Sequence, residues 1–171
     1  MTENQLDFIL VKEPGSTVLA EEIRNILLHE KEEIDKKTEL FLFMAARNDL
    51  IKKIILPALN DQQHVISDRS FISSCVYQSN NDDLSDIYWT HKRFMSAIPD
   101  HIFFLDIDPK KALERKQENE INRFEEKGLD FHYDVYEKYK KLAENKIIYS
   151  INAEDRTPFL IAEQIYNLSF T

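Results

Sequence analysis

The sequence predicts an α/β protein built on a parallel β-sheet. Apolar runs of strand length alternate along the chain with longer stretches in which apolar residues recur at helical spacing. The short runs are almost continuously apolar, as in strands that are buried on both faces. Strand-helix alternation of this kind predicts a sheet covered by helices on both faces. In such sheets ligands bind beyond the carboxyl ends of the strands, so the residues that follow each strand are candidates for a site.

Each predicted strand is followed by a predicted helix. The strands are expected at FILV (8–11), HVIS (64–67), HIFFLDI (101–107) and IIYSI (147–151). Helical periodicity is seen in Leu19, Ile23, Ile26 and Leu27, in Leu40, Met44, Ile51 and Ile55, and over residues 84–97, 127–144 and 157–168. Two pairs, Asp108–Pro109 and Thr157–Pro158, combine a capping side chain with a proline suited to the first helical turn.

Length and composition predict one domain over residues 1–171, with no internal boundary. No apolar run approaches the roughly 20 residues of a membrane span, and the start, MTENQLD, is unlike a signal peptide, so we expect a cytoplasmic protein without a membrane partner. A net charge of -9 disfavours a nucleic-acid partner. The chain has two glycines, so loops that wrap phosphate are scarce. The single cysteine, Cys75, is expected to be a small buried apolar residue.

Charged residues follow the first two predicted strands. KEPGST (12–17) brings Glu13 to the end of the first strand, although a turn that leads into a capped helix would also explain this segment. Asp68 and Arg69 follow the second strand. A carboxylate and a guanidinium at this position suit a magnesium ion and a phosphate, and the alternative is a local ion pair or a helix cap.

Two further features suit a nucleotide. Phe43 and Arg47 are four residues apart and would share a helix face, where a flat heterocycle could stack on the ring and bond the guanidinium. Packing of Phe43 in the core is the alternative. The segment ALERKQENEINRFEEKG (112–128) places Arg115 and Arg123 among acidic residues. It predicts a mobile solvated arm, which is either a plain solvated helix face or a lid that neutralises charge in phosphoryl transfer.

Five segments, in register over residues 8–152, resemble the bacterial thymidylate kinases. KEPGST resembles that family's REPGGT, TELFLFMAAR (38–47) its TELLLFAADR, and SDRSFISSCVYQS (67–79) its DRYxxSSxAYQG. PDHIFFLDIDPKKALER (99–115) is similar to PDLTIYLDVDPExALER, and NRFEEKGLDFHYDVYEKY (122–139) to DRFExExxxFxxxVRxxY. The resemblance implies a three-layer, P-loop-kinase-like fold and a homodimer that phosphorylates dTMP with ATP and Mg²⁺, giving dTDP and ADP.

The resemblance also implies roles for individual residues. Phe43 would stack on thymine, Arg47 would form a hydrogen bond with its edge, and Ser74 and Gln78 would also contact the base. Arg24 and Arg69 would bind the dTMP phosphate. Tyr77 would line the sugar, and Glu13 would lie near the sugar and the magnesium-water network. Asp68 would join the magnesium shell. Arg115 and Arg123 would belong to a lid at about 115–128, where arginine stabilises charge that grows in the transition state.

The sequence departs from the family pattern at several positions. Lys12 replaces arginine, Ser16 and Ser79 replace glycines, Ser70 replaces an aromatic residue, Asn122 stands for aspartate, and Tyr136 stands where arginine is common. Serine tolerates positive φ poorly, so altered loop geometry is expected at the two glycine positions.

The largest departure concerns the phosphate loop. The family begins with a strand, GxxGxGK[ST] and a helix, but no GK[ST] occurs here, and Gly15 and Gly128 are far apart. No ATP-binding residue can therefore be named. In the family this first strand lies centrally, between those that hold HVISD and HIFFLDID. The chain is expected to be an incomplete reading frame, a degenerate paralogue or a half that needs a partner chain.

Three functions remain open. The first is the acceptor half of a dTMP kinase. The second is a catalytically inactive fragment or degenerate protein that still binds thymidine nucleotides. The third is a deoxynucleoside kinase, because Asp68-Arg69-Ser70 also resembles the acid-Arg-Ser motif of those enzymes.

Overall fold

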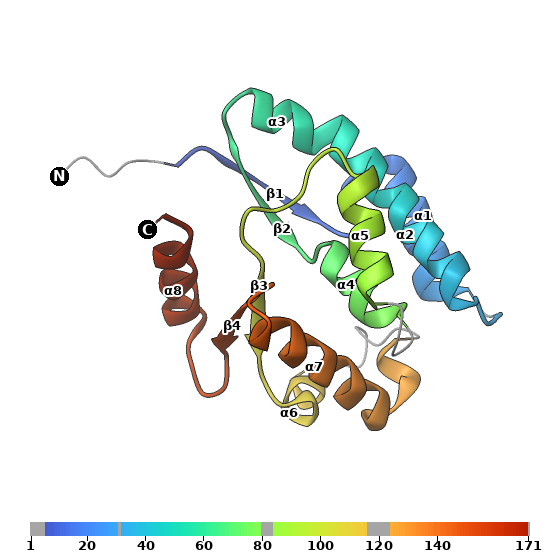
Figure 1. The fold of residues 1–171 in the computed structure, drawn as a ribbon, viewed down its shortest axis with the longest axis vertical. Coiled ribbons are helices and arrows are strands. Elements are labelled where there is room, and N and C mark those ends of the chain that lie inside the picture. Colours follow the sequence, from blue (N-terminus) through green and yellow to red (C-terminus); the bar gives the residue numbers. More distant parts are fainter. Residues whose placement is uncertain (1–5, 31, 80–83, 116–123, 171) are drawn as a thin grey trace. The chain divides into compact units, whose positions relative to one another are not determined.

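The computed structural model describes residues 6–30, 32–79, 84–115 and 124–170, in two compact units, Met1–Ile98 and Pro99–Thr171. The amino-terminal unit contains β1 (Phe8–Lys12), α1 (Val18–His29), α2 (Lys36–Leu50), the π-helix η1 (Ile51–Ile55), α3 (Leu56–Asn60), β2 (His64–Asp68), α4 (Phe71–Tyr77) and α5 (Leu84–Phe94) (Figure 1). The carboxyl-terminal unit contains β3 (Phe103–Asp106), α6 (Pro109–Glu114), the 3₁₀-helix η3 (Glu125–Lys127), α7 (Leu129–Glu144), β4 (Tyr149–Asn152) and α8 (Pro158–Phe170).

The predicted α/β fold with parallel strands is confirmed. β1 pairs with β2 in parallel, from Phe8 opposite His64 to Lys12 opposite Asp68, and β3 pairs with β4 in parallel. In the part of the chain that the structure describes, the strands form two two-stranded sheets, one within each unit.

Side-chain caps explain where several helices begin. Thr17 Oγ1 accepts a hydrogen bond from Ala20 N at 3.1 Å, which caps α1. The predicted Asp108–Pro109 start is confirmed, because the Asp108 carboxylate caps α6 and Pro109 is its first residue. At the start of α8, Thr157 Oγ1 accepts from Leu160 N at 3.4 Å.

Two helical features go beyond the sequence prediction. The periodic stretch that ends near Ile55 is not one α-helix, because the π-helical turns of η1 separate α2 from α3. Pro57, which has no backbone N–H to donate, is the second residue of α3, in the turn that follows this π segment. The short helix α4 was not predicted, although its segment contains the apolar residues Phe71, Ile72 and Cys75, which the fold buries.

One hydrophobic cluster of the amino-terminal unit lies between α1 and α2, which run side by side (Figure 1). Its buried residues are Ala20, Ile23, Leu27 and Ala46, and Leu42 and Phe43 pack against them. Cys75 is also buried, as predicted, and burial raises the pKa of its thiol to about 12. Among the described residues, no helix is both long enough and apolar enough to cross a membrane.

Candidate functional site

Two hydrogen-bonded bridges connect α2 with α4 on either side of Phe43. Arg47 Nη1 donates to Ser74 Oγ at 3.4 Å, and Gln78 Nε2 donates to Glu39 Oε2 at 3.1 Å. Glu39, Phe43 and Arg47 follow one another at intervals of four residues, so they share one face of α2. All four bridging side chains are buried. The structure therefore brings the predicted residues Phe43, Arg47, Ser74 and Gln78 into one cluster.

Arg47 also forms a buried ion pair with Glu13. Its Nε donates to Glu13 Oε2, and the two side chains are 5% and 7% exposed. Glu13 is held just beyond β1, where its backbone N–H donates to Asp68 O at 2.9 Å. Burial raises the pKa of Glu13 above its ordinary value, and the Arg47 charge offsets part of the rise. The placement of Glu13 near a sugar or magnesium stays a prediction.

His91 on α5 completes the surroundings of Arg47. Its side chain is fully buried, and its Nδ1 lies 3.4 Å from Arg47 Nη1. Burial, assisted by the Arg47 charge, lowers the pKa of His91 to about 3, so the ring is neutral near pH 7. Because the guanidinium only donates, Nδ1 must accept and Nε2 must carry the proton. Among the described side chains, Nε2 is the buried polar atom without a hydrogen-bond partner.

The loop after β1 is shaped by close contacts. A Cβ added at Gly15, where φ is 143°, would meet Glu21 Oε1 at 2.7 Å and Lys12 Cε at 2.9 Å. Ser16, which replaces a family glycine, has a φ of 70° and donates its N–H to Glu21 Oε1 at 3.0 Å. It therefore adopts the backbone conformation that glycine favours. Arg24 Nη1 donates to Pro14 O at 2.9 Å, so this arginine supports the loop.

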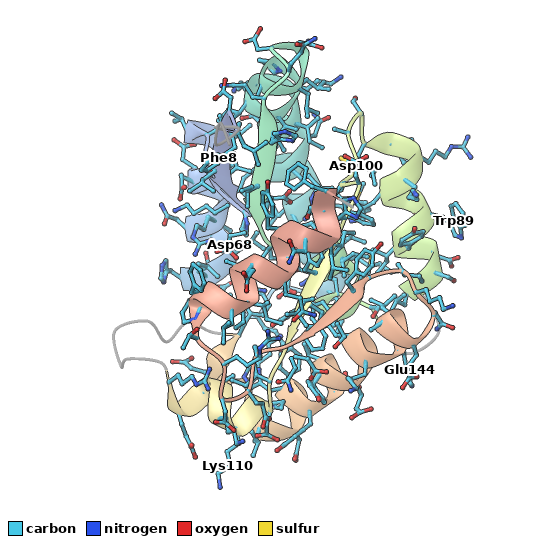
Figure 2. The ribbon with its side chains drawn as sticks, turned by 90° about the vertical axis from the view of Figure 1, so that its left-hand side faces the viewer. Phe8, Asp68, Trp89, Asp100, Lys110 and Glu144 are labelled. Carbon is cyan, nitrogen blue, oxygen red and sulfur yellow. The ribbon has the colours of Figure 1, made fainter. Side chains whose placement is uncertain are left out.

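Asp68 and Arg69 stand at the carboxyl end of β2, and Figure 2 marks Asp68 there. Both side chains are exposed. Arg69 has a φ of 70°, and its guanidinium carbon lies 5.6 Å from the centre of the Tyr77 ring, which gives a cation-π contact. Asp68 is the last residue of β2 and Arg69 follows it, so both lie at the carboxyl end of the strand, where the sequence predicts a site. The magnesium and phosphate roles remain predictions.

The two predicted lid arginines belong to the other unit. Arg115 is exposed at the carboxyl end of α6, and Arg123 lies outside the described residues. Tyr136, where the family commonly has arginine, donates to Asp106 Oδ1 at 2.8 Å. Burial and this hydrogen bond raise the pKa of Tyr136 to about 12. The tyrosine therefore serves a local network that also includes Lys140, whose Nζ lies 3.3 Å from Asp106 Oδ2.

Among the residues that the structure describes, no glycine-rich loop is found that could hold the phosphates of ATP. In those residues, no group of three or more His, Cys, Asp and Glu side chains could hold a metal ion. The 171 residues contain no GK[ST], and neither Gly15 nor Gly128 belongs to a glycine-rich loop.

Glu39 and His91 are the two polar residues of this cluster to which the sequence analysis gave no role. Glu39 could have been found, because it lies four residues before Phe43 in the segment that resembles TELLLFAADR. No sequence signal marks His91, which reaches Arg47 across 44 residues of chain.

Comparisons with known proteins agree with the sequence resemblance. The sequence model of the thymidylate kinase family matches residues 1–164. The thymidylate kinase of Rickettsia rickettsii (strain Sheila Smith) is 39% identical over 165 residues, which are 92% of this chain and 79% of the relative. That of Chlorobium limicola is 38% identical over 147 residues, 78% of this chain and 67% of the relative. The crystal structure of thymidylate kinase from Ehrlichia chaffeensis matches with a TM-score of 0.71 and 28% identity, covering 96% of this chain and 82% of that one.

These matches and the parallel α/β fold define a member of a phosphotransferase family of the nucleotide kinase class. The chain belongs to the thymidylate kinase family.

Proposed function

We propose that this chain carries the dTMP-binding half of a thymidylate kinase, which converts ATP and dTMP into ADP and dTDP. The observation that carries the proposal is the cluster around Phe43, in which a ring on α2 lies between two buried polar bridges. A base stacked on Phe43 would find hydrogen-bonding groups on both sides. Such a surface suits a flat heterocycle with polar edges.

The phosphate of dTMP would lie beyond the strand ends, in contact with Arg24 and Arg69. Arg69 supports this role because it follows β2 directly and its guanidinium is exposed. Arg24 is within the same unit, on α1, where it already bonds the Pro14 carbonyl. Tyr77, which contacts Arg69, would line the sugar, and Asp68 would join the magnesium shell.

We further propose the three-layer, P-loop-kinase-like architecture, which has a central strand and a phosphate loop that are not among the residues the structure describes. Each sheet has only two strands within the described residues, and a two-stranded sheet is marginally stable by itself. Residues 1–171 would act as one domain. The lid at about 115–128, with Arg115 and Arg123, stays a prediction because most of it lies outside the described residues.

A homodimer is also proposed. Large apolar side chains are exposed on helices of the amino-terminal unit, among them Phe41 on α2 and Trp89 on α5, which Figure 2 shows projecting from its helix. A second copy of the chain would cover such residues. The cytoplasmic location is proposed on the family resemblance alone.

A second function is an inactive protein that binds thymidine nucleotides, and the missing GK[ST] favours it. Isothermal titration calorimetry with dTMP and dCMP tests the part that both functions share. We expect a folded sample to bind dTMP in preference to dCMP. A sample with native helical circular dichroism that fails to bind dTMP would contradict both functions.

A further inference from the structure

The orientation of the Gln78 amide is fixed by a buried carboxylate. Gln78 Nε2 donates to Glu39 Oε2 at 3.1 Å, and the two side chains are 3% and 2% exposed. In this hydrogen bond the amide nitrogen faces Glu39, and the amide oxygen faces away from it. Rotating the Gln78 amide by half a turn would place its oxygen against the Glu39 carboxylate oxygen in a buried environment, which costs free energy.

The helix geometry supports this arrangement. Glu39 lies in the first turn of α2, where the helix dipole stabilises negative charge. In the same turn, Lys36 Nζ donates to the carbonyl oxygen of Ser79, the residue after Gln78, at 3.3 Å. The end of α4 is therefore tied to the start of α2 by two contacts, and Gln78 has little freedom to move.

The two bridges leave one acceptor and one donor without a hydrogen-bond partner. Within the part of the chain that the structure describes, Gln78 Oε1 and Arg47 Nη2 take part in no hydrogen bond. Gln78 Oε1 can only accept, and Arg47 Nη2 can only donate. In the proposed site, both atoms would face the edge of a base that stacks on Phe43.

We propose that Glu39 is a positioning residue that makes the site select bases in which a ring N–H adjoins a carbonyl oxygen. This inference rests on the proposed function. Thymine and uracil present N3–H to Gln78 Oε1 and O4 to Arg47 Nη2. Cytosine instead presents its N3 acceptor to Gln78 Oε1, which is also an acceptor, and its 4-amino donor to Arg47 Nη2, which is also a donor. Neither contact can then form a hydrogen bond. Unpaired buried polar groups of this kind are a strong source of discrimination.

The test is the Glu39→Gln variant, which keeps the shape of the side chain. The introduced amide both donates and accepts, so the Gln78 amide becomes free to rotate and present its nitrogen to the base. Calorimetry with dTMP, dUMP and dCMP should show the dTMP/dCMP affinity ratio falling about tenfold. The dTMP/dUMP ratio should not change, because these two bases share the same edge. If Glu39 only stabilised the fold, Glu39→Gln would weaken the binding of all three nucleotides equally.

Gln78→Leu is the second variant, because it removes the amide oxygen without touching Glu39. It should lower the dTMP/dCMP ratio by itself, and adding Glu39→Gln to it should lower the ratio no further. If the wild type prefers dTMP and the folded variants keep its ratio, this inference is wrong and the proposed function stands. If the folded wild type does not bind dTMP, both fail.

Discussion

Glu13 and Arg47 are 34 residues apart in the chain, and they form a buried ion pair that joins the end of β1 to α2. Arg47 is at the same time a hydrogen-bond partner of Ser74 and a neighbour of His91. One guanidinium therefore connects four separate segments of the amino-terminal unit. Its charge is compensated by Glu13, which makes that carboxylate important for stability as well as for the site.

Glu13→Gln should lower the free energy of unfolding by about 3–5 kcal/mol, because it leaves the Arg47 charge buried without a counter-charge. Urea unfolding followed by circular dichroism measures this loss. Lys53→Met is the control, since it breaks the ion pair of an exposed lysine with Asp49 and should change stability little. Equal effects of the two variants would contradict the importance of the buried pair.

His91 should make stability depend on pH. Its folded-state pKa of about 3 is below the ordinary 6.5, so folding favours the neutral ring. The stabilisation is complete above pH 6.5 and is lost as the pH falls toward 3, by roughly 1.4 kcal/mol for each pH unit. His91→Asn retains an acceptor near Nδ1 but does not titrate. The difference in free energy of unfolding between the wild type and His91→Asn should therefore shrink as the pH falls from 7 to 4. Urea unfolding at pH 7, 6, 5 and 4 measures this difference. If it stays the same at all four pH values, His91 does not contribute to the pH dependence.

Phe43→Leu should weaken dTMP binding by roughly tenfold, because stacking of a base on an aromatic ring contributes about 1–3 kcal/mol. Phe41→Leu is a matched control two residues away on α2, where the side chain is 68% exposed. Calorimetry with both folded variants decides the matter. The predicted stacking role of Phe43 fails if the two variants bind dTMP equally well.

The 171 residues should transfer phosphate from ATP to dTMP at no more than a trace rate. Losing one preorganised donor can cost about 10²–10³ in rate, and a missing phosphate loop removes several together. Adding a strand, GxxGxGK[ST] loop and helix before residue 1 should restore turnover, and Arg69→Ala should abolish it again. A coupled assay of ADP release measures both. Appreciable turnover by the unmodified 171 residues would show that they do contain a site for the phosphate donor ATP.

The local structure could be predicted from the sequence because local physics decides it. Continuous apolar runs gave the positions of all four strands to within two residues at either end. The Asp108–Pro109 pair marked the start of α6, because capping needs only a side-chain oxygen and the backbone of the next turn. The spacing of Phe43 and Arg47 placed them on one helix face for the same reason.

Tertiary structure decided which side chains meet. Glu13 with Arg47, Glu39 with Gln78 and Arg47 with His91 are pairs that lie 34, 39 and 44 residues apart. No local pattern encodes such contacts, since they depend on how α2 packs against α4 and where β1 ends. Burial, which lowers the pKa of His91 and raises that of Glu13, likewise exists only in the packed structure. The sequence by itself therefore determined the strands, the helix starts and the family, while packing decided the partners and the charge state of the site.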